Sequence, residues 1–135
     1  MIVAGIDCGA KNTKTVIMKA GQIIGNASVL TGFNQQEAVA QSLKQALAAA
    51  QVDRSQLKAI GGTGSGKESI ADLDSSVNDI NAMAKAAHYF FPNSRTVTDV
   101  GAEEGRAVKI DENGAVVDFA INEKCAAGAG AFIEA

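Results

Sequence analysis

The stretch IVAGIDCGAKNTKTVIMK, residues 2–19, decides the fold, because it contains a strand, a tight turn and a second strand. Residues 2–7 are an apolar run that ends in Asp7, and residues 15–19 return to a β pattern, so a hairpin is predicted. The small residues of the turn let backbone N–H groups converge on an anion, and a carboxylate at a strand end can hold a magnesium ion. An ordinary hairpin fits the same residues, so this stretch alone leaves both interpretations open.

The order strand, Asp-x-Gly turn, strand occurs a second time. Residues 95–100 read as a strand that delivers Asp99, and a hairpin with strands 107–110 and 115–121 follows, with an Asn-Gly pair in its turn. One Asp-x-Gly turn precedes a helical section and the other follows it. Two turns of the same chemistry could therefore grip a polyphosphate and its magnesium ion from opposite sides.

Helical sections and two further strands are predicted between these turns. Residues 23–30 and 57–61 read as strands. Asn34 and Glu37 have capping-box spacing, and the apolar residues behind them recur at helical intervals, so this helix is expected to pack on the sheet. Apolar residues over 70–91 recur every three or four positions, which predicts one long helix or two in succession, ended by the following proline.

Residues 61–67, GGTGSGK, fit the first part of the P-loop pattern G-x-x-x-x-G-K. A P-loop needs a hydroxyl directly after the lysine to bind magnesium, and Glu68 places a repelling carboxylate there instead. A P-loop also normally follows the first strand of its domain, whereas this stretch follows the fourth predicted strand. We therefore expect a flexible glycine loop that lines a cleft.

The stretch NEKCAAGAGAF, residues 122–132, joins a thiol to a glycine pair and an apolar helical pattern. Cys125 follows a strand-like run and precedes residues that read as helix, so its sulfur is expected at or near a helix N-terminus. The helix dipole favours a thiolate there, and a thiolate is what iron or zinc binds. A small buried apolar cysteine is the open alternative. The single histidine, His88, lies far away in sequence and is interpreted as a packing residue.

Composition bounds the class of protein. The chain has 135 residues, 47% of them hydrophobic, which is enough for a compact soluble domain. Its net charge of −3 includes no basic run, which argues against nucleic acid or an anionic membrane surface as a partner. The apolar N-terminal stretch is too short for a signal or spanning segment, and Cys8 and Cys125 form no pair motif. A cytoplasmic location is therefore expected.

The two Asp-x-Gly turns resemble the phosphate loops of the actin, sugar-kinase and heat-shock ATPase superfamily. Within it, residues 5–9 (GIDCG), 99–106 (DVGAEEGR) and above all 122–130 (NEKCAAGAG) resemble the activators of 2-hydroxyacyl-CoA dehydratases together with the ATP-binding subunits of benzoyl-CoA reductase. The resemblance implies an α/β fold, with the ribonuclease-H-like mixed sheet and flanking helices of the actin-like ATPases. It also implies a first lobe over residues 1–94 and the beginning of a second lobe over residues 95–135.

The same resemblance implies an activity, cofactors and partners. Members of this family form a homodimer or a related heterodimer that holds one [4Fe-4S] cluster at the subunit interface, with two cysteines from each subunit. Hydrolysis of ATP, bound with Mg²⁺, drives a low-potential electron from ferredoxin or flavodoxin onto a CoA-ester dehydratase or reductase. The chain is therefore expected to be an ATPase and a reductase-activating component.

The resemblance also implies roles for individual residues. Four carboxylates match catalytic positions, of which the two glutamates would position magnesium or the attacking water: Asp7, Asp99, Glu103 and Glu104. The matching nucleotide-binding positions are Gly9, Ala10, Lys11, Asn12, Thr13 and Lys14 in the first loop, and Gly101 and Ala102 in the second. Cys125 matches the first cluster ligand.

Some positions depart from the family pattern. Ala10 stands where a hydroxyl is frequent, and the Ala102-Glu103-Glu104 variant is more similar to the benzoyl-CoA reductase branch. The second cluster cysteine and the adenine-binding part would lie beyond Ala135, so the chain is interpreted as the N-terminal half of a protein of about twice the length. Cys8 cannot replace that cysteine, because it lies in the phosphate strand.

Two functions of other classes remain open. A small-molecule kinase of the same superfamily, with Asp99 or a neighbour as base, would transfer phosphate to a sugar and hold no iron. A non-catalytic nucleotide-binding module is favoured by the short chain and by the alanine replacements in the loops.

Overall fold

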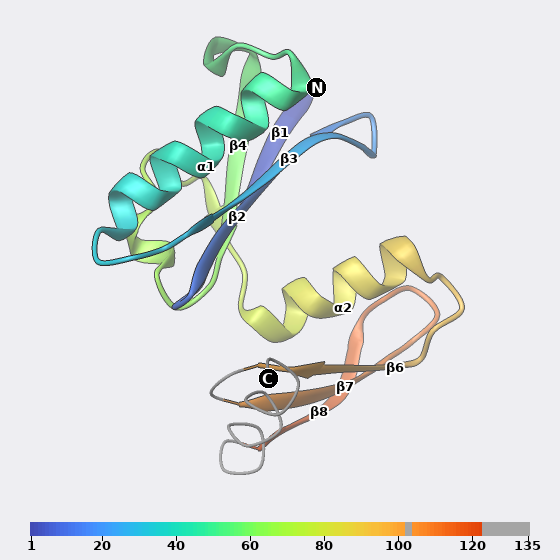
Figure 1. The fold of residues 1–135 in the computed structure, drawn as a ribbon. Helices are drawn as coiled ribbons and strands as arrows, with labels where there is room; N and C mark the ends of the chain where they lie inside the picture. The colour runs from blue at the N-terminus through green and yellow to red at the C-terminus, as the bar shows by residue number, and fades with distance from the viewer. Residues whose placement is uncertain (102–103, 123–135) are drawn as a thin grey trace. The chain divides into compact units, whose positions relative to one another are not determined.

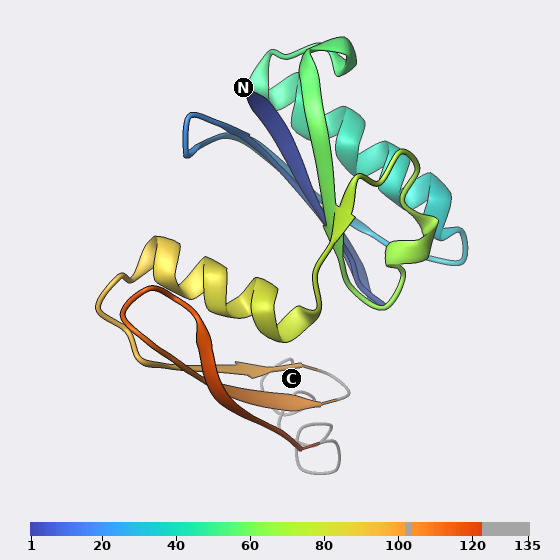
Figure 2. The same ribbon diagram turned by 180° about the vertical axis from the view of Figure 1, so that it is seen from behind.

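The computed structural model describes residues 1–101 and 104–122. Contacts divide the chain into two compact units, one over Met1–Asn78 and one that begins at Asp79. Each unit combines a β-sheet with one longer helix (Figures 1 and 2). No helix in the described ranges is long and apolar enough to cross a membrane.

The first unit is built on a five-stranded mixed sheet in the order β3-β2-β1-β4-β5. Strand β2 is antiparallel to both β1 and β3, whereas β4 runs parallel to β1 and β5 parallel to β4. The hairpin expected from residues 2–19 is confirmed. The elements are β1 (Ile2–Cys8), β2 (Asn12–Lys19), β3 (Gln22–Leu30), the 3₁₀ turn η1 (Arg54–Gln56), β4 (Leu57–Thr63) and β5 (Ser75–Ser76).

Helix α1, Gln35–Ala50, packs on this sheet, mainly over β2 and β3 (Figure 1). It begins where the sequence predicted. The side chain of Asn34 accepts a hydrogen bond from the N–H of Glu37 at 3.0 Å, which satisfies a donor that the first helical turn leaves unpaired. Its apolar stripe joins the inward residues of the sheet in one buried core: Ala4, Ile6, Cys8, Ile17, Val39, Ala46, Leu47, Leu57, Ile60 and Ile70.

Strand β1 alternates between this core and the opposite face of the sheet, as the two-residue period of a strand requires. Ala4, Ile6 and Cys8 are buried, and the residues between them are half-buried. Asp7 therefore lies on the face opposite α1, at the end of the strand. This placement is what makes its carboxylate available to the turn that follows.

The prediction of one long helix, or two in succession, over residues 70–91 is wrong in its first part. A 3₁₀ turn, η2 (Lys67–Ser69), and strand β5 come first, and the helix, α2, runs only over Asp79–Phe90. Ile70 and Leu73 recur at helical spacing, but they pack into the core of the first unit. Burial of an irregular segment can produce a helix-like spacing without a helix, and periodicity alone does not separate the two cases.

The second unit is a three-stranded antiparallel sheet in the order β6-β7-β8, with α2 packed against it. Ala84 of α2 forms a small buried core with Val108 and Ile110 of β7. The apolar side of α2 thus covers the central strand of this sheet (Figure 2). The strands are β6 (Thr96–Val100), β7 (Gly105–Ile110) and β8 (Val116–Asn122).

The turn between β7 and β8 is the Asn-Gly turn that the sequence predicted. Gly114 has a φ of +78°, and the N–H of Asp111 donates to the carbonyl of Ala115 at 2.9 Å. A Cβ on Gly114 would lie 2.7 Å from Cβ of His88. His88 therefore packs closely against this turn, as expected of a packing residue.

The compact units divide between Asn78 and Asp79, whereas the sequence placed a lobe boundary between residues 94 and 95. Helix α2 belongs with the second unit, because its apolar residues pack on β7. The correspondence between these units and the lobes of an actin-like ATPase stays a prediction.

Candidate functional site

Asp7 stands at the end of β1 between residues of two neighbouring strands. It is paired with Lys14 of the antiparallel strand β2 and with Thr63 of the parallel strand β4. Paired residues of adjacent strands project from the same face of a sheet, so a carboxylate, an ammonium group and a hydroxyl share the face opposite α1. The strand register therefore creates a polar site at this end of the sheet.

The turn after Asp7 is closed by its own backbone. The N–H of Gly9 donates to the carbonyl of Asn12 at 3.0 Å, and Ala10 and Lys11 form the exposed tip. A Cβ on Gly9 would lie 2.8 Å from the same carbonyl oxygen, so a residue with a side chain would force the turn open. The nucleotide-binding residues predicted for the first loop thus occupy one surface turn and the start of β2.

Thr31, the residue directly after β3, stabilises this turn and was not predicted as a site residue. Its hydroxyl donates to the carbonyl of Gly9 at 2.8 Å, and its N–H donates to the carbonyl of Lys11 at 2.9 Å. The same hydroxyl lies 2.8 Å from the hydroxyl of Thr13, and both threonines are buried. A threonine in a connecting segment carries no sequence signal for this role, because only the pairing of β2 with β3 brings it to the turn.

The glycine loop after β4 lies directly against the end of β1. Gly64 has a φ of +96°, and a Cβ there would lie 2.4 Å from the carbonyl oxygen of Cys8 and 2.6 Å from Oδ1 of Asp7. The N–H of Gly66 donates to the same carbonyl of Cys8 at 2.8 Å. The glycine loop expected from the sequence therefore borders Asp7. The P-loop-like stretch is not one continuous loop, because residues 61–63 continue strand β4.

Cys8 is a core residue of the first unit. It is fully buried, and its sulfur accepts a hydrogen bond from Oγ1 of Thr13 at 3.7 Å. A Cβ on Gly66 would lie 2.6 Å from this sulfur, so the glycine loop packs directly over it. Cys125, the predicted cluster ligand, lies outside the described residues.

The second Asp-x-Gly turn joins β6 to β7. Asp99 of β6 is paired with Arg106 of β7, and the N–H of Gly101 donates to the carbonyl of Glu104 at 2.9 Å, which closes the turn. The described second-loop residues therefore gather at one end of this hairpin. Two further predicted site residues lie outside the described ranges: Ala102 and Glu103.

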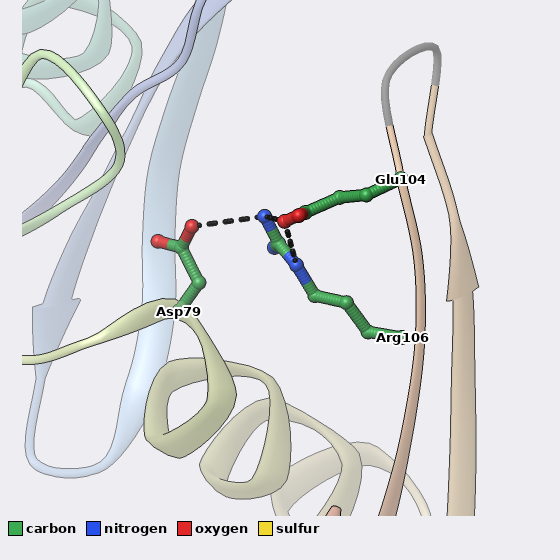
Figure 3. A network of polar contacts seen from close by, with 3 residues as sticks. All are labelled: Asp79, Glu104 and Arg106. Atoms are coloured by element: carbon green, nitrogen blue, oxygen red, sulfur yellow. Dashed lines mark hydrogen bonds and ion pairs between the residues drawn. The ribbon is translucent and has the colours of Figure 1, made fainter. Parts of the chain in front are cut away.

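Arg106 connects the second turn to helix α2 (Figure 3). Its Nη2 lies 3.1 Å from Oδ2 of Asp79, the first residue of α2, and its Nε donates to Oε1 of Glu104 at 2.6 Å. Nη2 also donates to the same oxygen of Glu104. The side chains of Arg106 and Glu104 are largely buried and that of Asp79 is about one-third exposed, so water and salt screen these charges less than on an open surface.

This environment raises the pKa of Arg106. Burial lowers the pKa of the guanidinium, but the hydrogen bond with Glu104 and the negative charges of Asp79, Glu104 and Asp99 outweigh that effect. Arg106 therefore stays charged throughout the physiological range. It was not predicted as a site residue, although Glu104 and Arg106 stand two positions apart and project from the same face of an extended chain, a signal that could have indicated the pair.

The structure brings the first-loop residues together and, separately, the described second-loop residues. Asp7 and Asp99 lie in different units, so their approach around one polyphosphate stays a prediction. Within residues 1–101 and 104–122, no group of three or more histidine, cysteine, aspartate or glutamate side chains is arranged to hold a metal ion.

Comparison with known proteins gives a family match over nearly the whole chain. A model of the BadF/BadG/BcrA/BcrD ATPase family matches residues 4–135. The activator of lactoyl-CoA dehydratase from Anaerotignum propionicum is 31% identical over 134 residues, which cover 99% of this chain and 52% of that relative. The chain spans about half the length of the curated relatives it matches.

Two solved structures are similar in both sequence and fold. Component A of (R)-2-hydroxyglutaryl-CoA dehydratase from Acidaminococcus fermentans is 29% identical, with a TM-score of 0.90 over 99% of this chain and 52% of that one. The activator of 2-hydroxyisocaproyl-CoA dehydratase from Clostridium difficile, solved with bound ADPNP, is 28% identical, with a TM-score of 0.87 over 99% of this chain and 50% of that one. The α/β fold of the actin-like ATPases expected from the sequence is confirmed.

Proposed function

Because the chain belongs to the BadF/BadG/BcrA/BcrD ATPase family, we propose that it forms the phosphate-binding part of an ATP-dependent activator of a CoA-ester dehydratase or of benzoyl-CoA reductase. In this function, ATP hydrolysis drives a low-potential electron onto the partner enzyme. A dehydratase activator and a benzoyl-CoA reductase subunit both match this chain over nearly its whole length, so the proposal includes both alternatives.

The observation that carries the proposal is the packing of two glycine turns around the carboxylate of Asp7. Gly9 closes one turn beside it, the backbone of Gly64 approaches the carboxylate itself, and Lys14 shares its face of the sheet. A phosphate group needs a backbone without obstructing side chains, since N–H groups must come within hydrogen-bond distance of its oxygens. The residues present therefore fit a nucleotide phosphate together with a magnesium ion.

Four residues at the first loop have specific tasks in this proposal. Asp7 would hold the magnesium ion, directly or through water, and the exposed tip at Ala10 and Lys11 would offer backbone N–H groups to the phosphates. Lys14 would add a positive charge to the same face. A magnesium ion, when bound, neutralises phosphate charge and stabilises the charge that develops on the transferred group. Two glutamates of the second loop, Glu103 and Glu104, would position magnesium or the attacking water, and Asp99 would be the catalytic aspartate of this loop.

The redox part of the proposal depends on Cys125. This residue would supply one ligand of a [4Fe-4S] cluster that bridges a homodimer or a related heterodimer, and a cluster of this kind stores a low-potential electron. Cys8 does not fit such a role, because it is fully buried in the core. Dehydratase or reductase subunits as partners, ferredoxin or flavodoxin as donor and a cytoplasmic location belong to the same proposal.

The full-length gene product, purified without oxygen, tests the nucleotide site. We expect calorimetric titration to show Mg-ATP binding, and Asp7→Asn to reduce ATP hydrolysis by about 100-fold, the size of effect seen when one charge-stabilising group is removed. Asp53→Asn is the matched control, because Asp53 lies in the same unit, away from the turn, and an asparagine can replace it as a helix cap. An unchanged rate in Asp7→Asn would contradict the assignment of this loop.

The iron content of the same preparation tests the redox part. We expect about four iron atoms per dimer and the brown colour of an iron–sulfur protein. Cys125→Ser should remove the iron and leave Mg-ATP binding intact. An iron-free protein that transfers phosphate to a sugar would show that the chain is a kinase of the same superfamily. A protein that binds ATP without hydrolysing it would indicate a non-catalytic module.

A further inference from the structure

We propose that Arg106 is a positioning residue that holds the carboxylate of Glu104 at the second phosphate loop, an inference that rests on the function proposed above. Nε and Nη2 of Arg106 both donate to one oxygen of this carboxylate, Oε1 (Figure 3). Oε2 takes no part in these two bonds. Arg106 therefore fixes the carboxylate through one oxygen and leaves the other to orient a water molecule or a hydrated magnesium ion.

The backbone of Arg106 is held in place on both sides, which limits the movement of its side chain. Arg106 lies on β7, the central strand of its sheet, where it is paired with Asp99 of β6 and with Ile121 of β8. A residue paired on both sides has little backbone freedom. The planar guanidinium adds a fixed fork of donors, which loses less conformational freedom per hydrogen bond than a lysine side chain would.

Asp79 prevents the guanidinium from turning away from Glu104. Its Oδ2 lies 3.1 Å from Nη2 of Arg106, and the side chain of Arg106 is only 22% exposed. The guanidinium is thus held between a carboxylate of helix α2 and a carboxylate of the loop. Such partly buried contacts with good geometry orient a side chain more firmly than a surface ion pair does.

The positive charge of Arg106 also helps to keep Glu104 in place among neighbouring carboxylates. The carboxylates of Asp79, Asp99 and Glu104 all act on this one guanidinium. Without the positive charge, the like charges of these carboxylates would repel one another, and the Glu104 side chain would turn toward solvent. The loss of Arg106 would therefore displace the carboxylate without breaking the β-sheet.

A purely structural role is the competing explanation, in which Arg106 only joins α2 to β7. The two roles differ in what Asp79→Asn does. This change weakens the contact with α2 but leaves both bonds from Arg106 to Glu104, whereas Arg106→Gln removes all of them. A structural role predicts similar effects of both variants, and a positioning role predicts that the rate of hydrolysis falls mainly in Arg106→Gln.

The experiment measures steady-state Mg-ATP hydrolysis and Tm for variants of the full-length gene product. We expect Arg106→Gln to lower kcat by about 10- to 100-fold with KM within about threefold of wild type, because the contact acts on the attacking water rather than on nucleotide binding. Arg106→Lys should recover part of the rate, and Asp79→Asn should stay within about threefold of wild-type kcat. Lys109→Gln is the matched control, because it removes an exposed positive charge from the same strand and should leave kcat unchanged.

A double-mutant cycle shows whether Arg106 acts through Glu104. Glu104→Gln keeps the size of the side chain and removes its charge, so Arg106→Gln should cause less than about a twofold further loss of kcat in that background. Independent, multiplicative losses would overturn the inference. So would wild-type kcat in Arg106→Gln, or an equal loss of kcat in Asp79→Asn. A wild-type protein that does not hydrolyse ATP would instead refute the proposed function, and this inference with it.

Discussion

The two Asp-x-Gly turns share a sequence pattern and a closing backbone hydrogen bond, but they differ in the contacts that surround them. The turn after Asp7 is closed by backbone and hydroxyl hydrogen bonds, beside a core of ten buried residues. The turn after Asp99 adjoins a partly buried ion-pair network, and the core of its unit has three buried residues among those described. Buried neutral contacts depend little on salt, whereas partly exposed charges are screened by it.

This difference predicts that salt weakens the charged contacts beside the second turn more than the neutral contacts of the first. A turn held by backbone hydrogen bonds and by glycines in tight contact has few alternative conformations. The predictions that follow compare the two regions directly.

The largest expected effect is the loss of stability when the core of the first unit is truncated. Ile17→Ala removes a fully buried side chain from the larger core and should lower the free energy of unfolding by about 3–5 kcal/mol. Ile110→Ala in the smaller core should cost less, about 2–3 kcal/mol, since fewer neighbours surround the cavity. Native-state hydrogen exchange would assign each loss to its unit. Equal losses would show that the two cores are equally well packed.

The next effect concerns the glycine loop that borders Asp7. Gly64→Ala introduces a Cβ 2.4 Å from a backbone carbonyl oxygen at a φ of +96°, so the loop must shift, at a cost of about 2–4 kcal/mol. Gly21→Ala is the control: its φ is +75° but no atom lies within 4 Å of the added Cβ, so only about 1 kcal/mol of backbone strain is expected. Denaturant unfolding measures both. Similar losses would mean that the close approach to Asp7 contributes nothing.

Local sequence signals were sufficient for several elements. The β1–β2 hairpin, the cap of α1 at Asn34 and the turn at Gly114 are formed by residues close together in sequence, so their turn chemistry and periodicity could be predicted. The glycine loop was also predicted, because Glu68 in the P-loop pattern excluded the alternative. The resemblance to one ATPase family then supplied the fold class, which the structures confirm.

Contacts that depend on strand register could not be predicted from sequence. Thr31 reaches the first turn only because β3 pairs with β2, and Arg106 meets Asp79 only because α2 packs on β7. Ile70 and Leu73 gave a helical period for a segment that is not a helix. In each case the deciding partner is distant in the chain, and a single sequence does not show which partner it is.

A smaller effect is expected from the buried hydroxyl pair that joins the sheet to α1. Oγ1 of Thr15 and Oγ of Ser42 lie 2.8 Å apart, and both residues are buried. Thr15→Val and Ser42→Ala should each lower the free energy of unfolding by about 1–2 kcal/mol, because each variant leaves the other residue's buried hydroxyl without this partner. The double variant should cost less than the sum of the two, since both polar groups are then gone. Additive losses would show that the pair does not act as one unit.

The smallest effect is a pH dependence in the second unit. Oδ1 of Asp111 accepts hydrogen bonds from the N–H groups of Ala115 at 3.0 Å and of Asn113 at 2.8 Å, and these bonds, helped by the charges of Arg95 and His88, lower the pKa of Asp111. A depressed pKa in the folded state contributes stability above the unfolded value, about 3.9, and this stability is lost as the pH falls through the lower folded value.

Asp111→Asn keeps an oxygen that can accept the same two bonds but cannot titrate. The free energy of unfolding, measured from about pH 5 down to about pH 2.5, should therefore fall less steeply in this variant than in the wild type. Glu112→Gln removes a carboxylate of the same turn that accepts neither bond, so it is the control. If the free energy of unfolding falls equally steeply with pH in Asp111→Asn and in the wild type, the charge of Asp111 does not stabilise the turn. In that case, this turn would be held by hydrogen bonds that do not depend on charge, as the turn after Asp7 is. The contrast between charged and neutral contacts would then rest on the ion pairs of Arg106.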